Sequence, residues 1–115
     1  MSQKKIVKSS SSKIFTNLRK RNKKVVLCHG VFDLLHYGHI SHFEQAKKFG
    51  DILVVSITPD NYVNKGPSRP AFDENTRMNA IAALKIVDYV ILNNSSTAIN
   101  SIKKIKPNFY CKGPD

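Results

Sequence analysis

Short apolar runs alternate along the chain with stretches in which apolar side chains recur every three positions. The runs at residues 25–28 and 89–92 are continuous, the run at 52–57 contains a single serine, and a shorter run follows at 109–111. Continuous hydrophobicity over so few residues is typical of strands that are covered on both faces of a parallel sheet. We therefore predict four buried strands at these positions.

Helices are predicted in the intervals between the strands. Three-residue periodicity predicts an amphipathic helix over residues 38–49, another over 97–106 and a short one over 13–21. A further helix begins after Asp73, which is a favoured N-cap residue. The segment 58–72 is rich in proline and glycine and is predicted to be a long loop.

This alternation of strands and helices favours one fold class. A helix-length crossover between two buried strands is almost always right-handed, and it returns the second strand parallel to the first. We therefore expect an α/β fold with a doubly wound, mostly parallel open sheet and helices on both faces, of the Rossmann-like kind. Such sheets bind their ligands beyond the carboxyl ends of the strands.

The basic charge is concentrated at the amino-terminal end of the sequence. The formal net charge is +11, and nine of the 19 Lys and Arg residues lie within residues 1–24, which contain no acidic residue. We expect 1–24 to be a basic, partly disordered arm and 25–115 to be a nearly neutral domain. Such an arm could contact a polyanion, but a solvated arm is the simpler interpretation, and we expect no nucleic acid partner.

The composition also bears on location. No apolar stretch approaches the roughly 20 residues that cross a bilayer, and no cleavable secretory signal opens the sequence. Cys28 and Cys111 lie far apart, without the close spacing of zinc ligands. We therefore expect a cytoplasmic protein with no membrane span, in which both cysteines are buried thiols.

Residues 29–39, where the first long run ends and a helix begins, carry the candidate chemistry. Gly30 and Gly38 allow the backbone to approach a phosphate, and the free N–H groups of a helix's first turn favour an anion. His36 and His39 lie three positions apart, so both can present an imidazole to the same phosphate. The pattern predicts a site for a nucleoside triphosphate.

Two other interpretations of this stretch stay open. His29 and His42 could join the motif histidines as zinc ligands, although no cysteine or acidic residue with matching spacing lies nearby. Asp33 either contacts a metal-bridged phosphate or caps the turn.

The sequences Gly-Val-Phe-Asp at 30–33 and His-Tyr-Gly-His at 36–39 resemble the signature of the cytidylyltransferase-like nucleotidyltransferases. The strand before them and the helix after them match the family in order and spacing. The resemblance implies three catalytic residues, His36, His39 and Lys65. It implies nucleotide-binding roles for Gly30, Val31, Phe32, Asp33, Gly38, Arg77, Lys112, Gly113 and Asp115, with Arg77 as a bidentate phosphate clamp, and it assigns no residue to a metal.

Two further sequences resemble one branch of this family. Lys-Gly-Pro-Ser-Arg-Pro at 65–70 and Lys-Gly-Pro-Asp at 112–115 look like those of domains that attach AMP to heptose 1-phosphate in lipopolysaccharide precursor synthesis. The resemblance implies transfer of a nucleoside monophosphate to a small phosphorylated acceptor, with Mg²⁺ accompanying the triphosphate. Two alternatives stay open: cytidylyl transfer to glycerol 3-phosphate, phosphoethanolamine or a similar acceptor, and a non-catalytic nucleotide-binding domain.

The resemblance also bears on assembly and extent. It implies a homodimer. Family members usually continue into a Ser/Thr-rich stretch before a final helix, whereas this sequence ends at Asp115. We therefore expect a domain that is truncated at its C-terminal end.

Overall fold

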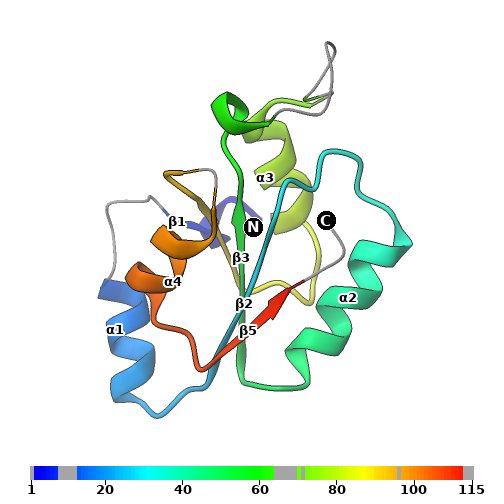
Figure 1. Cartoon of the computed structure of the whole chain (residues 1–115). Helices are drawn as coiled ribbons and strands as arrows, with labels where there is room; N and C mark the ends of the chain where they lie inside the picture. Colours follow the sequence, from blue (N-terminus) through cyan, green and yellow to red (C-terminus); the bar gives the residue numbers. More distant parts are fainter. Residues whose placement is uncertain (1, 8–12, 64–69, 71, 96, 113–115) are drawn as a thin grey trace.

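The computed structural model describes residues 2–7, 13–63, 70, 72–95 and 97–112. Its centre is one five-stranded sheet in which every pair of neighbouring strands is parallel (Figure 1). The Rossmann-like fold class is confirmed, because all four predicted strands are present and a fifth joins them. In order across the sheet the strands are β1 (Ile6–Val7), β4 (Tyr89–Leu92), β3 (Ile52–Ile57), β2 (Val25–Gly30) and β5 (Phe109–Lys112).

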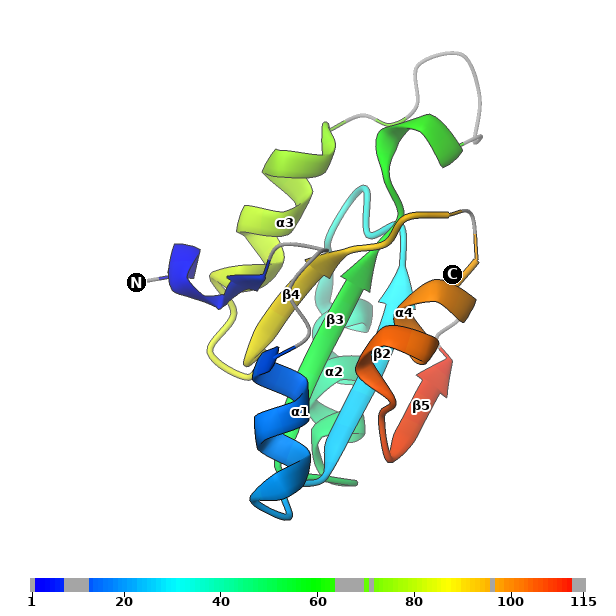
Figure 2. The ribbon, with the colours of Figure 1, turned by 90° about the vertical axis from the view of Figure 1, so that its left-hand side faces the viewer.

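Four α-helices cover the two faces of the sheet. α2 (Tyr37–Lys47) and α3 (Glu74–Ala82) lie on one face, and α1 (Lys13–Lys20) and α4 (Ile99–Ile105) lie on the other (Figure 2). Each corresponds to a predicted helix. Within the described ranges, no helix has the length and apolar content needed to cross a bilayer.

The residues of β2 explain why its apolar run is continuous. Successive residues of a strand point to opposite faces. Val26 and Cys28 therefore pack into the cluster that includes α2 and α3, while Val25 and Leu27 pack into the cluster that includes α1 and α4. All four side chains are fully buried, as expected for a strand covered on both sides.

Part of the segment 1–24 belongs to the domain and not to a separate arm. β1 extends the sheet by pairing with β4, and α1 buries Phe15 and Leu18 against the sheet. The guanidinium of Arg19 donates a hydrogen bond to the carbonyl of Ile105 (2.7 Å). The boundary expected at the end of the segment therefore does not separate two units among the described residues. The charge count did not reveal this because the residues that join the core are the few apolar ones.

The connections between strands define the edge of the sheet at which a ligand is expected. β2, β3 and β4 follow one another toward one side of the sheet through helices on the α2 face, whereas the connection after β4 carries α4 on the opposite face and places β5 beside β2. The carboxyl ends of β2 and β5, at Gly30 and Lys112, therefore flank the topological switch point, where open α/β sheets bind ligands.

Candidate active site

The turn that follows β2 is folded tightly against the sheet. Phe32 has a left-handed backbone conformation (φ 52°), which is uncommon for a residue with a side chain. Its buried ring packs edge-on against His39 and Phe43, with centroid distances of 5.4 and 5.2 Å. A Cβ on Gly30 would come within 2.8 Å of the same ring, so this position needs glycine. The turn thereby fixes where α2 begins.

α2 begins in a capping box made of two histidines. His36 is the N-cap, and its Nδ1 accepts a hydrogen bond from the N–H of Gly38 (3.0 Å). In return, Nδ1 of His39 accepts a hydrogen bond from the backbone N–H of His36 (3.2 Å). The two rings lie 4.1 Å apart between centroids. A Cβ on Gly38 would come within 2.7 Å of the His36 ring, so the glycine of the motif makes room for this cap.

These contacts determine which ring nitrogen of each motif histidine carries the proton. A nitrogen that accepts a hydrogen bond presents its lone pair, so in the neutral rings of His36 and His39 the proton is on Nε2. Each ring therefore has an Nε2–H donor at the positive end of the α2 dipole. His39 is 7% exposed and His36 is exposed, so one ring is sheltered and the other meets solvent.

Asp33 joins the turn to the chain that follows the long loop. Its Oδ1 accepts a hydrogen bond from the N–H of Phe72 (2.9 Å). This contact supports the structural interpretation of Asp33, in which the carboxylate holds the turn. Its contact with a metal-bridged phosphate stays a prediction.

Arg77 does not have the arrangement of the bidentate phosphate clamp that we predicted. Its side chain is only 1% exposed. It donates four hydrogen bonds of 2.6–3.0 Å, to the carbonyl oxygens of Val31, Thr58 and Phe72 and to the carboxylate of Asp60. A guanidinium has five N–H donors, so at most one is left, whereas a bidentate clamp needs two. Arg77 instead ties the turn after β2 to the chain on both sides of the long loop.

The remaining predicted residues lie partly outside the described ranges. Lys65, Gly113 and Asp115 are among those that the structure does not describe, so their roles stay predictions. Lys112 is exposed at the end of β5, and its register partner on β2 is His29. The sheet thus brings Lys112 to the edge that carries the motif.

Two features beside the turn were missed by the sequence interpretation. One is a cavity of about 230 Å³ whose lining includes Phe32, Leu35 and Phe72. The other is a set of buried polar side chains on the α4 face, to which Ser56 and Ser101 belong. A polar residue inside an otherwise apolar strand, as in 52–57, was the signal that could have indicated this second feature.

The zinc interpretation of the four histidines finds no support in the described part of the chain. No group of three or more His, Cys, Asp or Glu side chains there is arranged to hold a metal ion. His29 instead contacts the hydroxyl of Ser56 (3.0 Å), and the rings of His36 and His39 form the helix cap.

Comparison with known proteins decides the family. The family model described as cytidylyltransferase-like matches residues 27–115, a range that includes both motifs. The chain belongs to the cytidylyltransferase-like family. The resemblance found in the motifs is therefore confirmed, and the chain falls in the nucleotidyltransferase class of enzymes.

Two relatives of this cytidylyltransferase-like chain carry the same name. It is 43% identical over 95 residues to the bifunctional protein HldE of Campylobacter fetus, covering 81% of this chain and 21% of that protein. It is 40% identical over 105 residues to the HldE protein of Helicobacter pylori, covering 90% of this chain and 23% of that protein. The chain thus spans about a fifth of the length of these relatives.

A solved structure supports the same assignment. The crystal structure of the lipopolysaccharide core biosynthesis protein from Thermoplasma volcanium superposes with a TM-score of 0.70 at 38% identity. The match covers 76% of this chain and 72% of that one. The cytidylyltransferase-like chain and this protein therefore share both sequence and fold over most of their lengths.

Proposed function

We propose that the chain transfers AMP from ATP to a sugar 1-phosphate, with heptose 1-phosphate as the best candidate, and releases pyrophosphate. The observation that carries the proposal is the pair of Nε2–H donors that His36 and His39 present at the first turn of α2, beside the switch point. The relatives add support, because one of them is named as a lipopolysaccharide core biosynthesis protein.

The proposed reaction is a direct displacement at the α-phosphorus. An oxygen of the acceptor phosphate forms a bond to this phosphorus, while the bond from the phosphorus to the bridging oxygen of the β-phosphate breaks and pyrophosphate leaves. No covalent intermediate with the protein is needed. Charge accumulates on the leaving phosphate oxygens, and preorganised donors aimed at such oxygens are an effective form of catalysis.

The residues of the chain divide this work among them. The Nε2–H groups of His36 and His39 donate to the phosphate oxygens, and the first turn of α2 adds the positive end of its dipole. Lys65 is expected to neutralise further phosphate charge. The backbone of residues 30–33 would seat the nucleotide, and Arg77 acts indirectly by holding that turn in place.

Magnesium would enter this reaction as part of the substrate. Mg²⁺ is usually held by substrate phosphates together with one or two carboxylates. The described residues offer no cluster of three or more ligating side chains, and Asp60 is already paired with Arg77. This scarcity of ligands among the described residues fits an ion that arrives bound to the triphosphate and bridges its phosphate oxygens.

Cytidylyl transfer is the second candidate. The family is described as cytidylyltransferase-like, and the motif histidines would serve CTP in the same way. A cytoplasmic location, the homodimer and the absence of a nucleic acid partner stay predictions.

The test is pyrophosphate release with ATP and with CTP, each combined with heptose 1-phosphate, glycerol 3-phosphate or phosphoethanolamine. The decisive variant is His39→Asn, because asparagine retains an acceptor for the N–H of His36 but has no Nε2–H. Loss of one such donor should lower turnover by about 100- to 1000-fold. His42→Gln, one turn further along α2, is the matched control and should keep wild-type turnover.

The outcomes separate the candidates. Turnover with one nucleotide and one acceptor, lost in the His39 variant and kept in the His42 variant, supports the proposal and identifies the substrates. Equal turnover in the His39 variant and the wild type would exclude the role given to the motif histidines. Nucleotide binding without turnover, for every pair, would identify a non-catalytic domain.

A further inference from the structure

A polar cluster lies at the same strand ends as the motif histidines but on the α4 face of the sheet. It consists of side chains from β2, β3, α4 and the residues that follow β3 and β4. Four of its members are at most 5% exposed, in a layer that is otherwise apolar. The proposed reaction uses none of them, and a buried polar cluster of this kind calls for its own explanation. The polar cluster comprises His29, Ser56, Thr58, Asn93 and Ser101.

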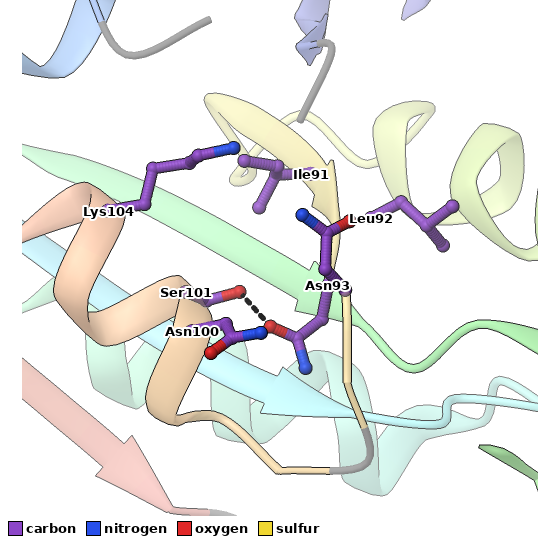
Figure 3. Close-up of a pocket in the computed structure, with 7 residues that line it drawn as sticks. Ile91, Leu92, Asn93, Asn100, Ser101 and Lys104 are labelled. Carbon is purple, nitrogen blue, oxygen red and sulfur yellow. Dashed lines mark hydrogen bonds between the residues drawn. The ribbon is translucent and has the colours of Figure 1, made fainter. Parts of the chain in front are cut away.

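The hydrogen bonds of the polar cluster run in one direction. The side-chain Nδ2 of Asn93 donates to the carbonyl oxygens of Ser95 and Thr97, which can only accept. This fixes the amide, so its oxygen accepts from the hydroxyl of Ser101 (2.6 Å; Figure 3). Because the Ser101 proton is engaged there, the hydroxyl of Ser56 must donate to Ser101 (2.6 Å).

The same direction fixes the proton of His29. The Ser56 hydroxyl has given its proton to Ser101, so it can only accept from Nδ1 of His29, which lies 3.0 Å away. Burial lowers the pKa of His29, with an opposing contribution from a hydrogen bond to the backbone of Ser56, so the ring is neutral at neutral pH. Its Nδ1 therefore carries the proton and its Nε2 carries a lone pair. His36 and His39 have the opposite tautomer.

The lone pair of His29 lies near the edge of the sheet at which a ligand is expected. Ser56 is the β3 register partner of His29, and Thr58 follows two residues nearer the carboxyl end. Nε2 lies on the Thr58 side, 3.4 Å from its Oγ1, and the same hydroxyl is 3.4 Å from the carbonyl of Gly30. Both distances are long for hydroxyl hydrogen bonds, so this shared hydroxyl satisfies Nε2 only weakly. His29 is the second-last residue of β2, and Lys112 is its partner on β5, so the ring lies at the carboxyl edge of the sheet with Nε2 on the β3 side.

We propose that Nε2 of His29 accepts a hydrogen bond from a sugar hydroxyl of the ligand bound at the switch point, and that the chain of Asn93, Ser101 and Ser56 holds His29 in the required tautomer. The inference rests on the proposed function, because it takes this ligand to be a nucleotide or a sugar phosphate.

Charge decides which part of the ligand His29 would contact. The phosphates belong at the first turn of α2, on the other face of the sheet, where donors and a positive helix end attract anions. A neutral lone pair would repel a phosphate oxygen but suits a hydroxyl. The ribose of the nucleotide and the sugar of the acceptor both offer such a group, and His29 would act as a positioning residue for one of them.

The tautomer can be measured without a substrate. The ¹⁵N chemical shifts of the labelled histidine rings should identify His29 as protonated on Nδ1. In Ser101→Ala the Ser56 hydroxyl loses its acceptor, so it can turn its proton toward His29, and the form protonated on Nε2 should gain population. If His29 of the wild type is protonated on Nε2, the inferred direction of these hydrogen bonds is wrong.

The contact itself is tested with ligands that lack one hydroxyl. His29→Asn is the decisive variant, because the amide can still donate to Ser56 but nothing replaces Nε2. Binding of ATP, 2′-deoxy-ATP and 3′-deoxy-ATP is titrated by calorimetry, or the CTP series if the wild type binds CTP. Loss of the contacted hydroxyl should weaken wild-type binding about 3- to 10-fold and should leave the variant unaffected. The Michaelis constants for the sugar 1-phosphate and a deoxy analogue are compared in the same way.

The results distinguish the two sources and the two hypotheses. If the variant no longer distinguishes ATP from its deoxy analogues, His29 contacts the ribose of the nucleotide. If it fails only to distinguish the sugar 1-phosphate from its deoxy analogue, His29 contacts the sugar of the acceptor. Discrimination that is the same in both proteins for every ligand overturns the inference. Wild-type pyrophosphate release is scored separately, so a nucleotide contact without turnover would refute the proposed function and retain the role of His29.

Discussion

Replacing Arg77 with methionine should destabilise the fold strongly. The guanidinium is buried and serves three carbonyl oxygens and the carboxylate of Asp60. Removing one partner of a buried charge pair costs about 3–5 kcal/mol. Asp60 is 35% exposed, so water relieves part of the loss and the lower value of about 3 kcal/mol applies. At roughly 4 °C per kcal/mol for a domain of this size, the unfolding midpoint should fall by roughly 12 °C.

The measurement is thermal and urea unfolding followed by circular dichroism, combined with nucleotide binding. The double variant Arg77→Met with Asp60→Asn isolates the pair, because the two single losses should add to more than the loss in the double variant. Arg21→Met, at an exposed position, is the matched control and should change stability by less than about 0.5 kcal/mol. If Arg77→Met kept wild-type stability but lost nucleotide affinity, the structural role of Arg77 would be refuted and its predicted role as a phosphate clamp would be supported.

Two further predictions follow from the buried titratable groups. Burial raises the pKa of the Cys28 thiol to about 12, with a smaller effect of Cys111. The thiolate that reacts with disulfide reagents should therefore be nearly absent at pH 8, and Cys28 should react only after unfolding. Rapid labelling of the folded protein would contradict this. The lowered pKa of His29 means that the unfolded chain binds the extra proton first, so stability should decline as the pH falls below about 6.5. Urea unfolding from pH 8 to 5 should show less of this decline in His29→Asn, and an equal decline in both proteins would exclude His29 as its source.

The fold could be predicted well because the spacing of apolar residues distinguishes its long strands from its helices. The runs at 25–28 and 52–57 became strands that are buried on both faces, and α2 arose where the three-residue spacing indicated it. The role of 1–24 was not predicted, since β1 has only two residues and its partner β4 lies far along the chain. Such a short strand is stabilised by the sheet it joins, and local sequence carries little sign of it.

The candidate site was predictable where a motif encodes local geometry. His36 and His39 were predicted to lie together at the start of a helix, and they do; their capping role depends on the same three-residue spacing but was not predicted. Arg77 depends on partners that the fold collects from four segments, and no spacing rule could distinguish a tether from a clamp. The proton direction at His29 depends on Asn93, which lies two strands away in the sheet.

The pairing of β2 with β5 has a consequence for how the protein folds. These neighbours are distant in sequence, since Val26 is in register with Phe109 and His29 with Lys112. Closing so long a loop is entropically costly, and parallel pairings of this kind form slowly compared with local contacts. β2, β3 and β4 can pair as soon as the chain through Leu92 is available, whereas the switch point between β2 and β5 exists only after β5 docks. Ligand binding should therefore be among the last properties gained during refolding, after most of the helical signal has returned.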